Sequence, residues 1–179
     1  MTIRQARKYL AVALVVFAAG CGDDDDNPNG PSLTGPIVFQ MQLSAANEVP
    51  PISNAESGAR GTATITMNVP RDNSGNPNGA GTIDFAVDLT GFPASGSSII
   101  LAHIHLGANG VNGGVEVNTG LSAANSIALT NGAGSFSRTG IQIDATKALQ
   151  LYATPQAYYF NVHSAMNPGG VVRAQMALQ

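Results

Sequence analysis

The sequence has a single cysteine, Cys21, so no disulfide can form within one chain. Tryptophan is absent and aromatic residues make up only 6% of the chain, which argues against a carbohydrate site built from stacked aromatic rings. Basic residues are also scarce, with 8 lysines and arginines against 11 acidic residues. Because these basic residues form no patch in the part expected to fold, we expect no nucleic-acid partner.

The N-terminus has the pattern of an export signal. Arg4, Arg7 and Lys8 precede an apolar run over residues 9–20, whose 12 residues are too few to span a bilayer comfortably. A positive segment followed by a short apolar segment is typical of a secretory signal peptide. We therefore expect residues 1–20 to be removed before the protein folds.

The end of the apolar run predicts lipidation. It reads "AAGC", and small residues before a cysteine resemble the lipobox of bacterial lipoproteins, with Ala18 where Leu is usual. The resemblance implies cleavage before Cys21 and acylation of its thiol, which would attach the chain to a lipid membrane. The alternative is an ordinary secretory signal followed by a free cysteine.

Residues 21–36 predict a tether between the anchor and the folded domain. Four consecutive aspartates repel one another, and the prolines and glycines that follow disfavour regular structure. A second interpretation is that an acidic run after a lipidated cysteine acts as a surface-export signal. Without residues 1–20 the chain has five basic residues against 11 acidic ones, a formal charge of about −6.

Residues 37–179 predict one all-β domain. Segments 61–69 and 82–89 alternate apolar and polar residues, which is typical of half-buried antiparallel strands. Strands are also expected at 37–43, 97–105, 156–163 and 170–178, with a hairpin over 126–143 that turns at Asn-Gly and one short helix over 144–152, capped by Asp144. This order predicts a single antiparallel Greek-key β-sandwich or barrel.

The chain has only three histidines, His103, His105 and His163. His103 and His105 alternate with an apolar set that is expected to face the core. That set is Ile100, Ala102, Ile104 and Leu106. His163 lies opposite Tyr158, Phe160 and Val162 in the same way. All three imidazoles are therefore expected on the outer face of the sheet, and they meet if the two strands are neighbours.

Three imidazoles together suit a zinc or copper ion. Asp84, Asp88 or Met166 would offer a further ligand. The alternative is a structural polar network in which the histidines bond to the backbone of nearby loops. Two such loops are available, the glycine-rich 107–114 and "MNPGG" at 166–170.

Other motifs predict structural roles. The glycines of 107–114 are expected to provide positive-φ turns, because the loop lacks the strand and helix that flank a nucleotide-binding motif. These glycines are Gly107, Gly110, Gly113 and Gly114. Arg173 is expected to face outward, paired with an acid or a carbonyl. Ser164 and His163 are adjacent in a strand and point apart, so they form no catalytic dyad, and we predict no catalytic residue.

Three blocks of sequence resemble the CHRD domain family, first described in chordin and widespread in bacterial secreted proteins. They are "LSAANEVPP" at 43–51, "AHIHLGANGVNGGV" at 102–115 and "YYFNVHSAMNPGGVVRAQM" at 158–176. The resemblance implies an all-β extracytoplasmic domain. The chain departs from the family pattern at Val171, where a glutamate is usual.

The "HIHLG" stretch is also distantly similar to copper/zinc superoxide dismutase, which has a His-x-His pair on a Greek-key barrel. Only one further histidine is present, so a two-metal site of that kind cannot be built. We therefore expect a non-enzymatic, lipid-anchored module of the bacterial cell envelope, on its periplasmic side or surface, with a protein or matrix partner. The alternative is a copper- or zinc-binding protein with dismutase-like redox activity.

Overall fold

The computed structural model describes residues 35–179. The expected signal peptide, Cys21 and most of the tether lie outside the described residues. No helix within residues 35–179 is long and apolar enough to cross a lipid bilayer. The strands are β1 (Ile37–Ser44), β2 (Arg60–Asn68), β3 (Gly81–Thr90), β4 (Ser98–Leu106), β5 (Val115–Asn118), β6 (Ile127–Ala128), β7 (Gly134–Ile143), β8 (Tyr158–Ser164) and β9 (Val172–Gln175), and the helix is α1 (Ala145–Ala153).

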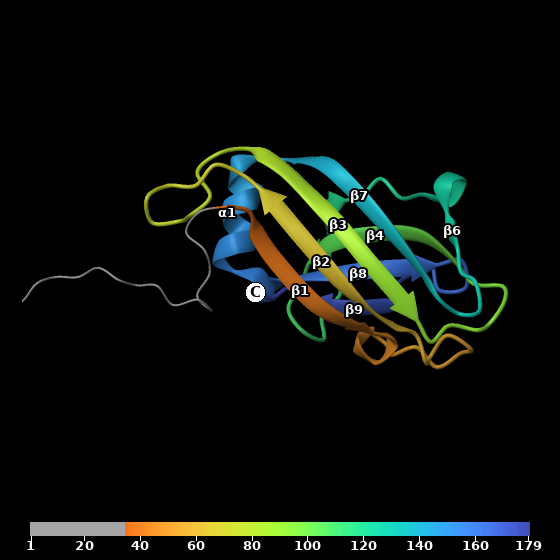
Figure 1. Ribbon diagram of the computed structural model, residues 1–179. Helices are drawn as coiled ribbons and strands as arrows, with labels where there is room; N and C mark the ends of the chain where they lie inside the picture. Colours follow the sequence, from red (N-terminus) through yellow and green to blue (C-terminus); the bar gives the residue numbers. More distant parts are fainter. Residues whose placement is uncertain (1–34) are drawn as a thin grey trace, which may run out of the picture. The chain divides into compact units, whose positions relative to one another are not determined.

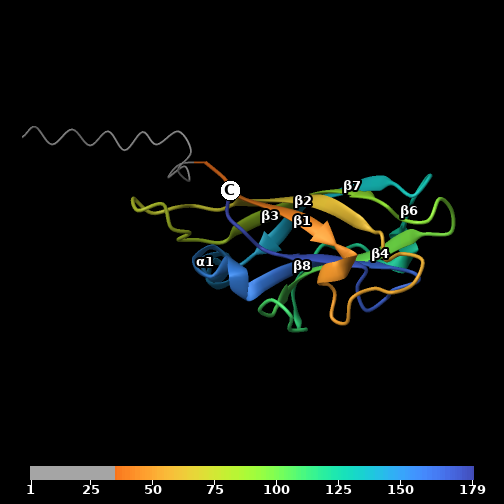
Figure 2. The ribbon, with the colours of Figure 1, turned by 90° about the horizontal axis from the view of Figure 1, so that it is seen from below.

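The strands form a sheet that folds over on itself into two layers. The order is β5-β4-β8-β9-β1-β2-β3-β7, with β6 paired to β4, and every pairing is antiparallel. One layer holds β1, β2, β3 and β7, and the other holds β4, β8 and β9 (Figures 1 and 2). β7 returns beside β3 and β8 returns beside β4, the non-sequential pairing of a Greek-key arrangement. The predicted antiparallel sandwich or barrel with one helix is confirmed.

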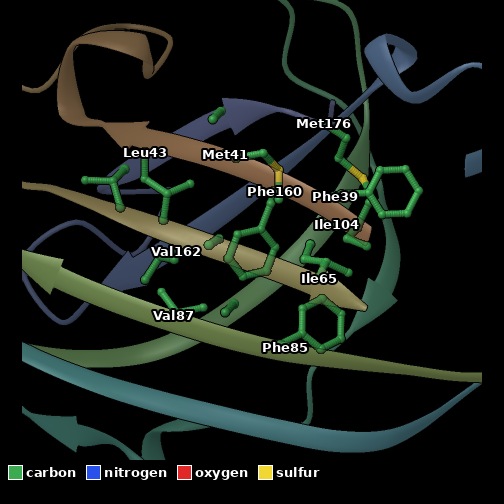
Figure 3. Close-up of a cluster of buried hydrophobic side chains, with 14 of the residues drawn as sticks. Phe39, Met41, Leu43, Ile65, Phe85, Val87, Ile104, Phe160, Val162 and Met176 are labelled. Atoms are coloured by element: carbon green, nitrogen blue, oxygen red, sulfur yellow. The ribbon is translucent and has the colours of Figure 1, made fainter. Parts of the chain in front are cut away.

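The apolar faces of the two layers meet in the core. Inward side chains from β1, β2, β3 and β8 point toward one another between the layers (Figure 3). At the centre, Phe85 of β3 stacks on Phe160 of β8, with ring centroids 5.6 Å apart. The alternation in β2 and β3 follows the predicted faces, since Ala63, Ile65 and Met67 are fully buried. Burial of such side chains is the main source of stability in a domain without disulfides.

The predicted core face of β4 is partly wrong. Ala102 and Ile104 are buried, but Ile100 is only partly buried and Leu106 is 47% exposed. Ile99 takes the buried position instead, because the pairing of β4 with β8 shifts register between Ile99 and Leu101. A bulge of this kind adds one residue and interrupts the two-residue period that the sequence pattern follows.

The expected hairpin over 126–143 is also only partly correct. The Asn-Gly turn is present, with positive φ at Asn131 and Gly132 and a bridge between Thr130 and Ala133. The strands on either side then diverge, because β6 pairs with β4 whereas β7 pairs with β3. The short strand β5, which pairs with β4, was not predicted.

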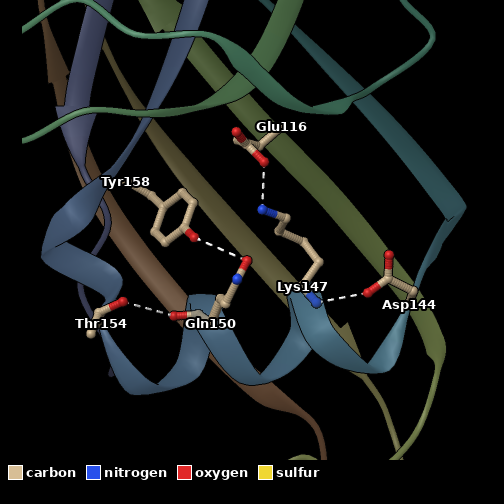
Figure 4. Close-up of polar contacts among 6 residues, drawn as sticks. All are labelled: Glu116, Asp144, Lys147, Gln150, Thr154 and Tyr158. Carbon is tan, nitrogen blue, oxygen red and sulfur yellow. Dashed lines mark hydrogen bonds and ion pairs between the residues drawn. The ribbon is translucent and has the colours of Figure 1, made fainter.

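The helix lies at one end of the two layers and is joined to β5 by an ion pair. Lys147 of α1 contacts Glu116 of β5, and its ammonium also lies 5.4 Å from the centre of the Tyr158 ring (Figure 4). Asp144 caps the helix as predicted: its Oδ1 accepts a hydrogen bond of 2.7 Å from the backbone N–H of Lys147.

Loss of this cap has a predictable effect. Asp144→Ala is expected to lower the free energy of unfolding by about 1 kcal/mol, because one N–H of the first helical turn loses its acceptor. Chemical denaturation would measure the change. Asp144→Asn is the control, since it keeps a side-chain oxygen at the same place and should lose no more than a few tenths of a kcal/mol. An equal loss in both variants would contradict the capping role.

Candidate metal-binding site

The two strands that carry the histidines are direct neighbours. β4 pairs with β8 so that His103 lies opposite Asn161 and Leu101 lies opposite His163. His105 follows two residues along β4 and faces the same side as His103. Each imidazole offers one ring nitrogen to a common point, and the three nitrogens lie within 4.8 Å of one another. The structure thus brings together the three residues predicted from the sequence.

The three histidines lie on the side of β4 and β8 that faces away from the apolar core, as predicted, but this side is not open to solvent. His103, His105 and His163 are only 6%, 8% and 5% exposed. Loop 107–114 and the turn after β8 both reach over them and bond to them. The predicted outer face is therefore a second buried face, lined with polar side chains.

Backbone carbonyls fix the orientation of two of the rings. Nδ1 of His105 lies 3.0 Å from the carbonyl oxygen of Gly113, and Nδ1 of His163 lies 2.9 Å from that of Pro168. A carbonyl only accepts, so in each neutral ring Nδ1 carries the proton and Nε2 keeps a free lone pair. Metal-binding histidines almost always donate their second N–H in this way.

One pair of nitrogens in the cluster already has the spacing of two ligands on one metal ion. Nδ1 of His103 lies 3.2 Å from Nε2 of His163. Two nitrogens bound to one tetrahedral ion at about 2.0 Å would be separated by about 3.3 Å. Without an ion, a proton on Nδ1 of His103 makes this contact a hydrogen bond. An ion would take the place of that proton, which would move to the other nitrogen of the same ring.

Burial keeps the cluster neutral. Desolvation is the largest cause that lowers the pKa of His103 to about 4, and the nearby His163 and His105 lower it further. Burial likewise lowers the pKa of His105 and of His163, although the bonds to Gly113 and Pro168 oppose it. At neutral pH the rings therefore present lone pairs, the form that binds a transition metal.

An aromatic stack supports His105. The Tyr159 ring lies parallel to the His105 ring, with centroids 4.9 Å apart and planes 6° apart. The Arg173 guanidinium packs on Tyr159, with Cζ 4.4 Å from the ring centre. The Tyr159 hydroxyl accepts a hydrogen bond of 3.1 Å from Gly113 N–H, so the stack also holds the loop that bonds to His105.

Arg173 lies on the outer side of the sheet, as expected, but it is buried there. It is 1% exposed, and the loops before β2 and after β4 enclose it. Its Nε donates to the carbonyl of Asn47 at 2.8 Å, and its Nη1 donates to Oδ1 of Asn112 at 2.9 Å. The predicted pairing with a carbonyl is correct, but the guanidinium fastens two distant loops to β9 instead of meeting solvent.

Glu48 belongs to the same polar layer, and sequence reasoning missed it. It is 5% exposed, and burial raises the pKa of its carboxyl group to about 7, although nearby Arg173 and Asn161 lower it. The available signal was the "NEVPP" block, where one acid stands in an otherwise uncharged segment. Val171, where the family pattern has a glutamate, is fully buried in the apolar core, so no carboxylate acts from that position.

The two suggested aspartates, Asp84 and Asp88, do not join the cluster. No aspartate, glutamate or cysteine within residues 35–179 lies close enough to all three histidines. Asp84 lies on β3 in the other layer and accepts hydrogen bonds from Asn68 and from Gly140 N–H. Asp88 also lies on β3, and Met166 is 49% exposed.

Two glycines of 107–114, Gly107 and Gly113, allow close packing. Only Gly110 has a positive φ, at 78°, so the predicted role is wrong for the other three. A Cβ on Gly113 would lie 1.5 Å from the carbonyl oxygen of Leu106, and one on Gly107 would lie 2.9 Å from the Tyr159 ring. The loop can cover His105 because these positions have no side chain.

Glu56, a buried carboxylate beside the turn after β8, has a structural role. It accepts hydrogen bonds from the Ser164 hydroxyl, from Ser97 Oγ at 2.8 Å and from Asn167 Nδ2 at 2.6 Å. Ser164 and His163 point to opposite sides of β8, as predicted. Glu56 therefore fixes the turn that places Pro168 against His163.

Acidification should act on the metal-free protein in two opposite ways. The folded pKa of His103 is depressed from 6.5 to about 4, so its stabilising contribution is complete above pH 6.5 and is lost as the pH falls toward 4. The folded pKa of Glu48 is raised from 4.5 to about 7, so the folded state takes up this proton first and gains stability as the pH falls from 7 toward 4.5.

Glu48→Gln separates the two effects. The unfolding free energy of this variant is expected to fall more steeply than that of the wild type between pH 7 and 4.5, by on the order of 3 kcal/mol over the range. Urea denaturation at several pH values would measure both slopes. Parallel slopes in Glu48→Gln and the wild type would contradict the prediction.

One family of known proteins matches this chain. The CHRD domain model matches residues 39–176, a range that contains Glu48, Arg173 and all three histidines. No curated protein and no solved structure matches the chain significantly. Since the match covers most of the chain, the protein belongs to the CHRD domain family.

Proposed function

We propose that this chain is a non-enzymatic binding module of the bacterial cell envelope, and that its ligand is a copper or zinc ion held by His103, His105 and His163. Membership of the CHRD family supports a binding or structural module. The observation that carries the metal assignment is the convergence of three buried imidazoles, whose ligand nitrogens lie within 4.8 Å of one another.

The donor set favours these two metals. Neutral imidazole nitrogen is a good ligand for zinc and copper and a poor one for calcium or magnesium, which prefer oxygen. Two of the rings already donate their second N–H to carbonyls, at 3.0 and 2.9 Å, so little reorganisation is needed to present Nε2. The buried Nε2 of His105 has no hydrogen-bond partner, which leaves its lone pair available.

Two features support a binding role over catalysis. The cluster is at most 8% exposed, so a substrate would have little access to a bound ion. The serine nearest to it along the chain, Ser164, is fully buried and donates its hydroxyl to Glu56, so a substrate could not reach it as a nucleophile.

Metal uptake tests the proposal directly. Purified wild-type protein, incubated with micromolar free copper or zinc and then desalted, should retain about one ion per chain by elemental analysis. A variant with all three histidines replaced by alanine should retain none, and circular dichroism would show whether it is folded. Wild-type protein that retains neither metal would refute the metal assignment. Copper-loaded protein that consumes superoxide faster than the metal-free form would refute the non-enzymatic part.

The envelope anchor has its own test. The proposal assigns acylation to Cys21, the only cysteine of the chain, directly after a signal-type segment. In a bacterial host the wild type should sediment with membranes, and Cys21→Ser should be found in the soluble extracytoplasmic fraction. Equal distribution of the two proteins would refute lipid anchoring and leave the metal assignment intact.

A further inference from the structure

Four buried polar atoms within residues 35–179 have no hydrogen-bond partner: Glu48 Oε1, His105 Nε2, Asn161 Oδ1 and Arg173 Nη2. All four belong to the polar layer on the outer side of β4, β8 and β9. Leaving such a group unpaired is unfavourable, so four in one region call for an explanation. Bonds among the described residues therefore do not satisfy every polar atom of this layer.

Asn161 links Glu48 to the histidines. In the sheet, Asn161 lies between His103 on β4 and Arg173 on β9. Its carboxamide and the Glu48 carboxylate both pack against Gly170, where a Cβ would come within 2.6 Å of Asn161 Nδ2 and 2.8 Å of Glu48 Oε2. A single residue, Asn161, therefore separates Glu48 from the histidine cluster, and Glu48 is not one of its ligands.

A metal ion bound to the histidines would change the charge balance around Glu48. A divalent ion on three neutral imidazoles would add two positive charges to a buried region that already contains Arg173. Buried charges are tolerated only when they are compensated, and Glu48 is the acidic residue that packs in this layer. The other buried carboxylate, Glu56, is fully engaged by Ser97, Ser164 and Asn167.

We infer that Glu48 is the counter-charge of the histidine site: it is protonated in the metal-free protein and gives its proton to the solvent when a divalent ion binds His103, His105 and His163. The inference rests on the proposed function. A cleft of about 420 Å³, lined by Glu48, Asn112 and Pro168 among others, gives the proton a route to water.

The charged and titratable groups around Glu48 agree with this role. Arg173 of β9 faces it and favours the ionised form, whereas burial outweighs Arg173 and holds the pKa at about 7. On β4 and β8 the titratable side chains of the layer are Tyr159 and the three histidines, and burial lowers the pKa of each histidine, which favours its neutral form. Binding of an ion at the histidines would thus add positive charge near the Glu48 carboxyl group, whose pKa is about 7.

Proton release on zinc binding measures this coupling. The full chain would be titrated with Zn²⁺ at pH 6.5 by calorimetry in two buffers that differ in ionisation enthalpy. With a pKa of about 7, Glu48 should release about three quarters of a proton in the wild type. A zinc-bound water also loses a proton near neutral pH, so the decisive quantity is the difference between wild type and Glu48→Gln.

Glu48→Gln should release about three quarters of a proton less than the wild type and bind zinc about tenfold more weakly at pH 7.5, as is usual when a residue behind the ligands is changed. Glu116→Gln, which removes a carboxylate paired with Lys147 instead, should match the wild type in both respects. Equal proton release and affinity in Glu48→Gln and the wild type would overturn the inference and leave the proposed function standing. No zinc binding by the wild type would overturn both.

A measurement on the wild type alone keeps the test valid if Glu48→Gln does not fold. The zinc affinity should rise about tenfold per pH unit below pH 7, where binding must displace the Glu48 proton, and less steeply above it. An affinity that is independent of pH between 5.5 and 7 would overturn the inference.

Discussion

Zinc is expected to raise the melting temperature of the wild-type protein by about 10 °C when it is present at about 1,000 times its dissociation constant. At this concentration an ion that binds only the folded state adds about 4 kcal/mol to the free energy of unfolding. In a domain of this size, each kcal/mol corresponds to a rise of a few degrees. The physical reason is that the three imidazoles converge only when β4 and β8 are paired. Calorimetric scans with and without zinc would measure the shift.

The matched variants make this prediction specific. His103→Ala combined with His163→Ala removes two of the three ligands and should abolish the shift. Replacing the acidic run of the tether by asparagine should leave the shift unchanged, which controls for weak binding by Asp23, Asp24, Asp25 and Asp26. A shift that survives loss of the histidines would place the ion elsewhere, and a wild type without any shift would contradict the proposed site.

Phe160→Ala is expected to lower the free energy of unfolding by about 4 kcal/mol, the largest effect that we predict for a single core substitution. Phe160 is fully buried between the layers and stacks on Phe85 at 5.6 Å. Its removal leaves a cavity that both layers would have to close, and it eliminates the aromatic contact. Phe160 also lies between Tyr159 and Asn161 on β8, so the polar layer should loosen together with the core.

A control on the helix tests whether burial is the cause. Leu149 lies on α1 and is 45% exposed, so Leu149→Ala should cost less than about 0.5 kcal/mol. Denaturant titration of both variants gives the comparison. A loss below about 1.5 kcal/mol in Phe160→Ala would mean that the layers collapse around the missing ring, and the core would then be more plastic than its packing indicates.

Local patterns predicted much of the fold. The alternation in 61–69 and 82–89 predicted which side chains of β2 and β3 face the core, because successive side chains of a regular strand point to opposite sides. Asp144 marked the start of α1, because an N-cap acts within one helical turn. The turn at Asn131 was also predicted, since the need for positive φ is a property of two adjacent residues.

Features that depend on strand pairing were not predictable in this way. The bulge between Ile99 and Leu101 changes which side chains of β4 are buried, and it exists only in the alignment of β4 with β8. Strand β6 was expected to pair with β7, but it pairs with β4. A strand of two residues is too short for its own sequence to determine its partner, so the tertiary structure decides the pairing.

The histidine cluster shows most clearly which features the sequence predicts and which only the tertiary structure decides. By itself, the sequence placed His103 and His105 on one side of a strand and His163 on the polar side of another, because alternation requires it. It could not show that Arg173 and Glu48 are buried, because their burial depends on loops that start far away in the chain, such as the one whose Asn47 carbonyl accepts a hydrogen bond from Arg173. Only the folded chain brings those loops over the sheet, and this turns a polar outer face into a closed, buried layer.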